Sequence, residues 1–456
     1  MKLFFNFKYL FLIACLFVFI YSPPLAYIPL SLIKWLSIFS IAGLLLYFKK
    51  ATLTVLKYKY VAYGITLLCL AIFYASIQDY VIGSDTSLGE SNFYKQTLVL
   101  IEVFPIALFI NFYSRKYLKF SLNDLLYSLI VIGIIQSLFC LIMFLIPGIK
   151  FIIFNSILSQ QVRTEEILEA GYYGNFRGFG ISINYLFSLP IFQGLLIAFI
   201  FYLCLINFKK YYYTLISIPL LFLSIILNAR IGLVPIIIFV GVAFIVYFKN
   251  LRVSAISQFV LILSVLIISV YAFFSITYQT TDLANNVDWI FKSYTQNKAF
   301  LEGTGDEGTL AILLDSHIHF PKDFNGNLFG EGLYLFGESE NSSSIRSDIG
   351  YIRNLYFGGY IYSLLIYSSF LMLFWGALRL QKTTLARILM YFLLVVMLVA
   401  HLKGNVFWSN PAYRSAYLIT LFPVVDRYFY RQEQRALLIA QQRYFTQMST
   451  SYKNNV

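Results

Sequence analysis

Charged residues are scarce in this chain, since Asp, Glu, Lys and Arg together make up 12% of its 456 residues. Apolar residues make up 59%, and the mean hydropathy is +0.75. A water-soluble core could not hide that much apolar surface, so lipid is the expected solvent for most of it. The net charge of +13 lies in short basic clusters between apolar runs, which argues against a nucleic-acid-binding face.

Cysteines and the motifs of soluble enzymes are also few. The four cysteines, at positions 15, 69, 140 and 204, each fall in an apolar run without paired spacing, so neither a disulfide framework nor a zinc site is expected. The sequence contains no glycine loop with a phosphate-binding lysine, no Gly-x-Ser-x-Gly turn and no His-Glu-x-x-His pair. We therefore expect no metal, no cofactor and no use of a cytoplasmic nucleotide.

Long apolar runs dominate what remains. A helix that crosses a bilayer needs about 20 largely apolar residues. Twelve runs approach that length, near residues 9–22, 28–47, 60–78, 95–113, 124–146, 186–207, 212–228, 231–248, 254–277, 352–378, 387–402 and 414–426. The sequence therefore predicts an all-α integral membrane protein with about twelve transmembrane helices.

The distribution of charge predicts the topology. If Met1 is cytoplasmic, the inward-facing segments hold 21 of the 34 Lys and Arg residues but only 3 of the 21 acids. This asymmetry follows the positive-inside rule and places both termini in the cytoplasm. The tail 427–456 has arginines at helical spacing, which indicates an amphipathic helix on the anionic leaflet or a solubilised helical end.

Two outward-facing segments are long. One covers about 147–185 and is glycine-rich; the other, 278–351, lies between the ninth and tenth helices and holds eleven acids and two of the three histidines. The chain thus divides into helices 1–9 (1–277), the large loop (278–351), helices 10–12 (352–426) and the tail (427–456). No similarity between the two halves is detectable, which weakens a transporter built from repeats.

Outward-facing cations are informative because they disobey the charge rule. Those that stand out are Arg163, Arg177, Arg230, Arg346, Arg353, Lys403 and Arg414, with His401 close to Lys403 in sequence. An Arg at the centre of a membrane helix costs about 2.5–3.5 kcal/mol and less near the interface, a cost that a bound anion would offset. Forked guanidinium groups suit a diphosphate, so we expect these side chains to line one outward-facing cavity. Snorkelling to lipid headgroups explains any single one equally well.

His317 and His319 alternate in the large loop. This spacing could ligate a metal on a strand, but no third ligand is marked, and we predict no metal site. A general base and a loop histidine without chemistry are the remaining interpretations.

Several short segments follow one another between residues 163 and 414. They are Arg177-Gly178-Phe179-Gly180, Asn228-Ala229-Arg230-Ile231-Gly232-Leu233, Leu328-Phe329-Gly330-Glu331-Gly332, Ser347-Asp348-Ile349-Gly350-Tyr351 with Phe357-Gly358-Gly359, and His401-Leu402-Lys403-Gly404 ahead of Arg414. In their order, their outward location and the long loop before the tenth helix, they resemble the Wzy family of O-antigen polymerases, within the O-antigen ligase/polymerase superfamily.

The resemblance implies a metal-independent glycosyltransferase on the periplasmic face of a bacterial inner membrane. It would move the growing glycan from undecaprenyl diphosphate to the non-reducing end of a new lipid-linked repeat unit. The implied partners are the undecaprenyl-diphosphate-linked oligosaccharide, membrane lipid and a chain-length regulator protein. In this reading Arg177, Arg230, Arg353, Arg414 and Lys403 bind the diphosphate, and Asp348, Asp315, Glu331 and His317 are candidates for the catalytic base.

Three alternatives stay open. An O-antigen ligase would hand the glycan to the lipid A core, but the ligase branch carries a histidine where this chain has Ser347 and Asp348. A flippase or transporter of lipid-linked oligosaccharide fits twelve spans, yet it leaves the loop 278–351 and the outward cations unexplained. A membrane glycosyltransferase with acids in its first outer loop fits less well, because residues 22–27 contain none.

Overall fold

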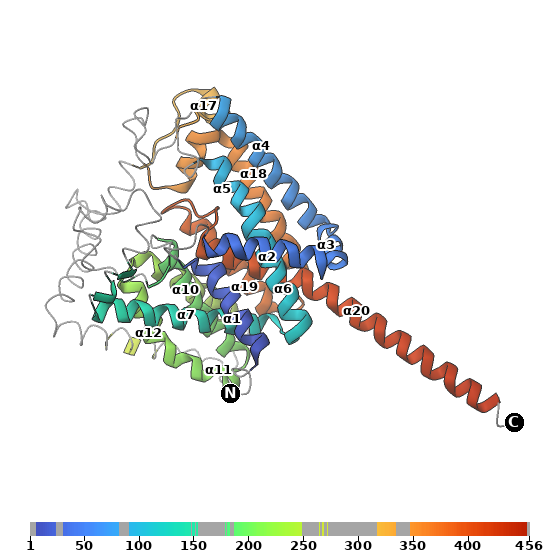
Figure 1. Ribbon diagram of the computed structural model, residues 1–456. Helices are drawn as coiled ribbons and strands as arrows, with labels where there is room; N and C mark the ends of the chain where they lie inside the picture. The colour runs from blue at the N-terminus through green and yellow to red at the C-terminus, as the bar shows by residue number, and fades with distance from the viewer. Residues whose placement is uncertain are drawn as a thin grey trace.

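The computed structural model describes residues 6–23, 31–81, 91–146, 148–150, 152–153, 178, 180–182, 187–248, 264, 267–268, 271, 317–333 and 347–453. These ranges form helices and loops without a β-strand (Figure 1), so the predicted all-α fold is confirmed for them. The segments are α1 (Phe7–Tyr21), α2 (Leu32–Leu46), α3 (Lys49–Leu56), α4 (Lys59–Val81), α5 (Asn92–Leu98), η1 (Val99–Val103), α6 (Phe104–Tyr113), η2 (Ser114–Leu118), α7 (Leu122–Leu145), α10 (Ser188–Ile206), α11 (Phe208–Tyr211), η3 (Tyr212–Ser217), α12 (Ile218–Ile226), η4 (Arg230–Gly232), α13 (Leu233–Phe248), α17 (Phe324–Phe329), α18 (Gly350–Leu380), α19 (Thr384–Ala400) and α20 (Pro411–Lys453).

Five helical segments are long and apolar enough to cross a membrane, and the bent pair α2–α3 makes a sixth if it counts as one span. The five are Lys59–Tyr80, Asn92–Leu118, Leu122–Leu145, Ser188–Ile206 and Gly350–Leu380. Other apolar helices, such as α1 and α19, coincide with predicted spans but are shorter. The fold is thus compatible with a membrane protein. The count of twelve stays a prediction, and the predicted ninth span at 254–277 lies mostly outside the described residues.

Small and neutral polar residues let the long helices approach one another. Ser369 of α18 donates a hydrogen bond to the Gly64 carbonyl oxygen of α4 over 2.8 Å. A Cβ atom on Gly64 would lie 3.0 Å from the Ser369 carbonyl oxygen, so a larger residue would push α4 and α18 apart. Asn111 of α6 donates to the Leu418 carbonyl oxygen of α20 over 2.9 Å. Close packing and interhelical hydrogen bonds hold helices together where lipid supplies no hydrophobic drive.

Three of the long helical paths are interrupted. The α2 and α3 axes meet at 96°, and the path from α5 to α6 contains the π-helical turn η1 and ends in a second one, η2. Within α18, Gly358 and Gly359 leave helical geometry, the latter with a φ of 64°. Breaks of this kind in membrane helices release backbone groups that a neighbouring segment must satisfy.

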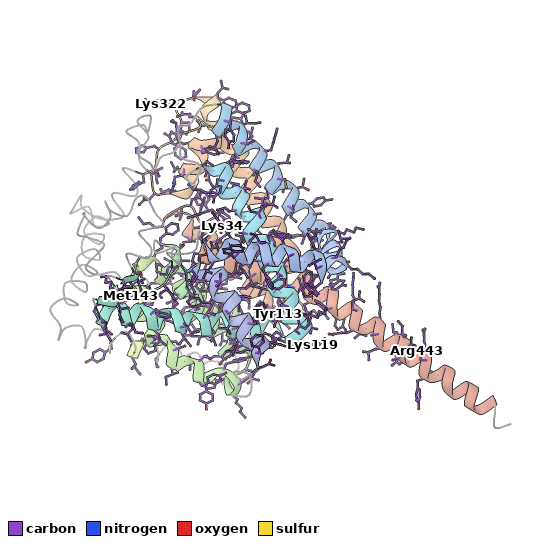
Figure 2. The ribbon with its side chains drawn as sticks, viewed as in Figure 1. Lys34, Tyr113, Lys119, Met143, Lys322 and Arg443 are labelled. Atoms are coloured by element: carbon purple, nitrogen blue, oxygen red, sulfur yellow. The ribbon has the colours of Figure 1, made fainter. Side chains whose placement is uncertain are left out.

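Chain segments from different helices meet at two places, which we call the α17 end and the η2 end. At the η2 end, Tyr113 Oη donates to the Lys8 carbonyl oxygen over 3.2 Å, and Arg115 pairs with Asp426 over 2.6 Å. At the α17 end, the Gly350 amide donates to the His401 carbonyl oxygen over 2.9 Å. Lys322 lies beside α17, far from Tyr113 and Lys119 (Figure 2). Each end therefore gathers segments that the charge rule assigns to the same side.

The predicted basic tail is helical and continues α20 without interruption. Figure 1 shows its last part running away from the body toward the C-terminus, with Arg443 on the projecting part (Figure 2). Residues 434–445 are all exposed. The helical part of the prediction agrees with the structure, whereas its location on a membrane surface stays a prediction.

Candidate functional site

The segment 328–332, which we call the strap, lies in the break of α18. Because Gly358 and Gly359 are not helical, the carbonyl groups before them need other donors. The strap supplies these donors: the Glu331 amide bonds the Tyr356 carbonyl oxygen over 2.8 Å, and the Gly332 amide bonds that of Phe357 over 3.1 Å. Two of the sequence segments singled out above, 328–332 and 357–359, are thus in direct contact.

Glycine is required on both sides of this contact. Gly330 has a φ of 81° and Gly359 a φ of 64°, a region that L side chains rarely adopt. A Cβ atom on Gly330 would lie 2.5 Å from the Gly358 backbone, and one on Gly359 would lie 2.6 Å from the Gly330 nitrogen. The two backbones therefore meet only because neither carries a side chain there.

The other face of the strap is held by α4. Tyr74 Oη and Gln78 Nε2 each donate to the Phe329 carbonyl oxygen over 2.7 Å. Before the strap, Asp323 caps α17 by accepting from the Gly326 amide over 3.1 Å. The strap thus joins α4 to α18 and fixes the first part of α18, which begins at Gly350, relative to the bundle (Figure 1).

This first part of α18 begins beside a cluster of polar side chains. Asp348 forms an ion pair with Lys403 over 3.1 Å, and both side chains are partly exposed, at 32% and 39%. Ser347 Oγ donates to the His317 carbonyl oxygen over 2.7 Å, and the Asp348 amide donates to His317 Nδ1 over 3.2 Å. The structure therefore brings together four residues from three sequence segments. Three of them, Asp348, His317 and Lys403, are candidates named from the sequence.

The hydrogen bond to His317 limits what this ring can do. Its Nδ1 accepts a backbone N–H, so this nitrogen carries no proton, and in the neutral ring Nε2 carries it. The lone pair that a general base needs is therefore already used. Asp348, in contrast, uses one oxygen for Lys403, and no further partner of its carboxylate is found in the described part of the chain. Of the two, Asp348 is the better placed to accept a proton.

Glu331 stands apart from this cluster. It lies where the strap meets α18, next to Tyr356, which is six residues beyond Gly350 and thus about 9 Å along the helix axis. Partial burial raises the pKa of its carboxyl above the ordinary value, and the nearby Asp323 carboxylate adds to the rise. The carboxyl of Glu331 therefore holds its proton more tightly than a solvent-exposed glutamate does.

His401 is enclosed in the protein and does not line the cluster. It is fully buried, with its ring edge-on to Tyr351 at 4.5 Å and to Phe407 at 4.9 Å between centroids. Its Nδ1 accepts from the Val406 amide over 3.2 Å, so Nε2 carries the proton in the neutral ring and faces Tyr367 Oη at 2.9 Å. Both nitrogens are therefore used in holding the turn after α19, which leaves none for an anion.

Arg414 is also fully engaged. Its Nη1 donates to the Phe19 and Ile20 carbonyl oxygens over 3.0 and 3.1 Å and to Ser22 Oγ, while Nε and Nη2 both reach Ser409 Oγ. The side chain is buried, and Glu102 interacts with its charge. Since the last carbonyl groups of a helix lack partners, Arg414 satisfies the end of α1. We correct the sequence-based assignment accordingly: this guanidinium has no donor left for a diphosphate.

The remaining cations are described to different degrees. Arg353 lies five residues beyond Asp348 on α18, is partly exposed and interacts electrostatically with His401. Arg230 begins η4, close to Asn228, whose Nδ2 donates to the Gly178 carbonyl oxygen over 3.0 Å. The segments 177–180 and 228–233 are thus also in contact. Arg163, Arg177, Arg346 and Asp315 lie outside the described residues.

Comparisons with known proteins add nothing to this geometry. No protein-family model, curated protein or solved structure matches the chain. Among the described residues, no group of three or more His, Cys, Asp or Glu side chains could hold a metal ion.

Four residues of the site region were not singled out in the sequence. Tyr74 and Gln78 hold the strap, while Asn354 and Tyr367 interact with His401, with 3.0 Å between Asn354 Nδ2 and Tyr367 Oη. In the sequence, Gln78 and Asn354 are marked only as polar residues near the end of an apolar run. That signal alone does not tell which partner such a side chain meets.

Proposed function

We propose that this chain is a polysaccharide repeat-unit polymerase of the Wzy type in a bacterial inner membrane. It would act on the periplasmic side, where the α17 end would lie. In this proposal the membrane part has about twelve helices, both termini are cytoplasmic, and the segment 278–351 forms the large periplasmic loop.

One observation carries the proposal. The short segments that resemble the family are in contact in pairs: 328–332 with 357–359, 347–351 with 401–404, and 177–180 with 228–233. These segments are separated by long stretches of chain, and nothing in hydropathy requires them to meet. Residues that act on one substrate must be brought together in space, and this arrangement supports that reading.

Asp348 and Arg353 are the residues we propose for the reaction. The carboxylate of Asp348 would take the proton of the acceptor sugar hydroxyl as its oxygen attacks the anomeric carbon of the donor glycan. The bond from that carbon to the diphosphate oxygen would break, and the undecaprenyl diphosphate would leave with the bonding electrons. Arg353 and Lys403 would stabilise the charge that develops on it, together with Arg177 and Arg230.

The proposal is tested by deleting the gene and separating the lipopolysaccharide on a gel. A polymerase deletion leaves lipopolysaccharide with a single repeat unit, because transfer of that unit to the lipid A core continues. Loss of every form that bears O-antigen would contradict the proposal and would indicate the ligase or the flippase. Complementation with Asp348→Asn separates catalysis from assembly: we expect wild-type protein levels and no long chains.

A further inference from the structure

Two lysines at the η2 end converge on one aromatic ring. The ammonium nitrogen of Lys116 lies 5.1 Å from the Tyr117 ring centroid, and that of Lys8, from the first turn of α1, lies 5.8 Å from the same centroid. By these two distances the ammonium nitrogens are at most about 11 Å apart. Lys116 also lies over the Phe48 ring at 5.1 Å, in the bend between α2 and α3.

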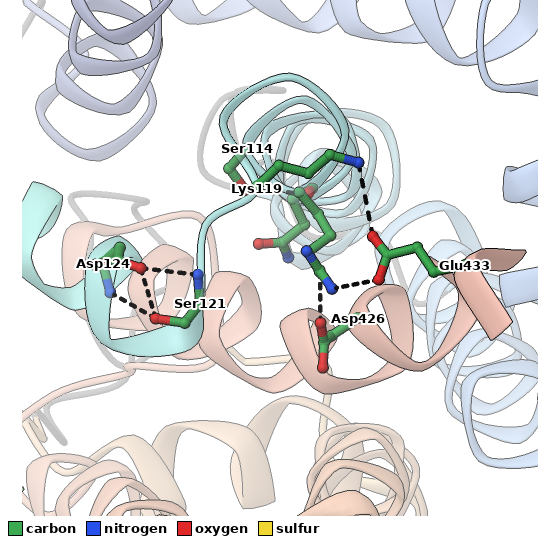
Figure 3. A network of polar contacts seen from close by, with 8 residues as sticks. Ser114, Lys119, Ser121, Asp124, Asp426 and Glu433 are labelled. Atoms are coloured by element: carbon green, nitrogen blue, oxygen red, sulfur yellow. Dashed lines mark hydrogen bonds and ion pairs between the residues drawn. The ribbon is translucent and has the colours of Figure 1, made fainter. Parts of the chain in front are cut away.

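Two other cations at this end pair with the acids nearby. Arg115 pairs with Asp426 at 2.6 Å and with Glu433 at 3.4 Å, and Lys119 pairs with Glu433 at 3.6 Å (Figure 3). The acids on α20 are thus used by Arg115 and Lys119. In the described part of the chain, neither Lys8 nor Lys116 forms an ion pair with a carboxylate.

The first turn of α1 adds to the positive charge. Asn6 caps the helix by accepting from the Lys8 amide over 3.0 Å, and the first turn contains no acid. A helix N-terminus carries a partial positive charge, so a lysine there is unfavourable unless an anion is near. Two ammonium groups and a helix N-terminus repel one another, and a bound anion would turn this repulsion into attraction.

The surroundings favour an anion with an apolar part. The site is held in place by the bond from Tyr113 to the Lys8 carbonyl and by contact of the Tyr113 and Tyr117 rings, 5.2 Å apart. Exposed apolar side chains on α1 and α2 continue from it, including Phe7 at 81%, Leu10 at 49% and Phe39 at 51% exposure. Such side chains can contact acyl chains, whereas free phosphate gains nothing from them.

We propose that Lys8, Lys116 and the first turn of α1 bind the phosphate of an anionic lipid in the leaflet at the η2 end. Clustered lysines and aromatic rings between membrane helices suit such a headgroup. The proposal depends on the chain spanning a membrane and not on its acting as a polymerase. It assigns to this end a ligand distinct from the lipid-linked sugars of the α17 end.

Native mass spectrometry of the full chain in neutral detergent, titrated with phosphatidylglycerol or with phosphatidylcholine, tests the proposal. We expect phosphatidylglycerol to bind more tightly. Lys8→Gln with Lys116→Gln should weaken its binding about 30-fold, at about fivefold for each lysine. The matched control is Lys119→Gln with Lys209→Gln. Lys209 lies at the same end, since its neighbour Lys210 pairs with Asp124 at the start of α7 over 3.6 Å. The control removes the same charge and should change binding less than twofold.

Three outcomes would overturn this assignment: equal affinity for the two lipids, equal weakening by the two double variants, and displacement of phosphatidylglycerol by equimolar inorganic phosphate. Each single lysine variant is measured as well, so a double variant that fails to fold does not remove the test. Lipopolysaccharide ladders should be unchanged in the Lys8/Lys116 variant, which separates this site from the polymerase proposal.

Discussion

The α17 end and the η2 end are held together by different chemistry. At the α17 end, backbone amides of the strap bond carbonyl groups of α18, and neutral side chains such as Gln78 complete the contact. At the η2 end, charged side chains join η2 to α20 through Asp426 and Glu433. The first arrangement leaves Asp348 and Lys403 as a partly exposed pair, whereas the second uses its acids for structure. Backbone contacts thus fix the region proposed to react without consuming its charged groups.

The largest effect is expected from Gly359→Ala, which should disrupt the backbone contacts that hold the α17 end together. Gly359 has a φ of 64° and a ψ of -164°, a region confined essentially to glycine, and another residue held there costs about 1–3 kcal/mol. The clash with Leu328 and Gly330 adds about 1–3 kcal/mol. We expect the strap to leave the break in α18 and long glycan chains to disappear from the lipopolysaccharide gel. Gly241→Ala is the control, because a Cβ there meets nothing within 4 Å, and it should leave the ladder unchanged.

Replacing one aspartate at each end, Asp348 or Asp426, should affect the rate of polymerisation at the α17 end and only the stability at the η2 end. Asp348→Asn should lower the rate of polymerisation about 10²–10⁴-fold by removing the proposed base. Asp426→Asn breaks the bond to Arg115 but leaves Glu433 for it, so we expect a loss of about 0–1 kcal/mol in the free energy of unfolding and normal chains. Rates are measured with purified protein and lipid-linked repeat units. A full ladder from Asp348→Asn would remove this residue from the mechanism.

The hydrogen-bond partners of Arg414 could not be predicted from the sequence. Its position near the start of an apolar run and its charge predicted that it lies in an outward-facing anion cavity. The sequence could not show that the carbonyl groups of Phe19 and Ile20 would reach the same guanidinium. The apolar runs predicted most described helices because burial in lipid depends on composition. The contact between 328–332 and 357–359 depends on backbone geometry. In the sequence, only the glycines of these two segments indicated it.

Replacement of Arg414 by lysine therefore tests stability and not binding of a diphosphate. Lysine keeps the charge but cannot reach Ser409 and the end of α1 together, so several hydrogen bonds are lost. At about 1.5–3 kcal/mol for each bond to a charged group, we expect a loss of about 3 kcal/mol or more in the free energy of unfolding. The variant should unfold at lower temperature in detergent, with unchanged polymerisation per folded molecule. A reduced rate at full stability would return Arg414 to the reacting site.

The smallest effect is expected at Glu331, and its sign depends on pH. Because burial and Asp323 raise the pKa of its carboxyl in the folded chain, the folded state holds this proton more tightly than the unfolded state does. Stability from this group is present below the unfolded pKa of about 4.3 and is lost as pH rises through the folded pKa. Glu331→Gln should therefore stabilise the chain slightly at pH 7 and have no effect near pH 3.

Glu433→Gln gives the comparison at the η2 end. It removes the contacts to Arg115 and Lys119, so it should destabilise the chain slightly at pH 7, opposite in sign to Glu331→Gln. Thermal unfolding of both variants and the parent chain between pH 3 and pH 8 measures the difference. Equal signs at pH 7 would mean that Glu331 is stabilised as a carboxylate, as Glu433 is. A carboxylate held in that way would compete with Asp348 as the proposed base.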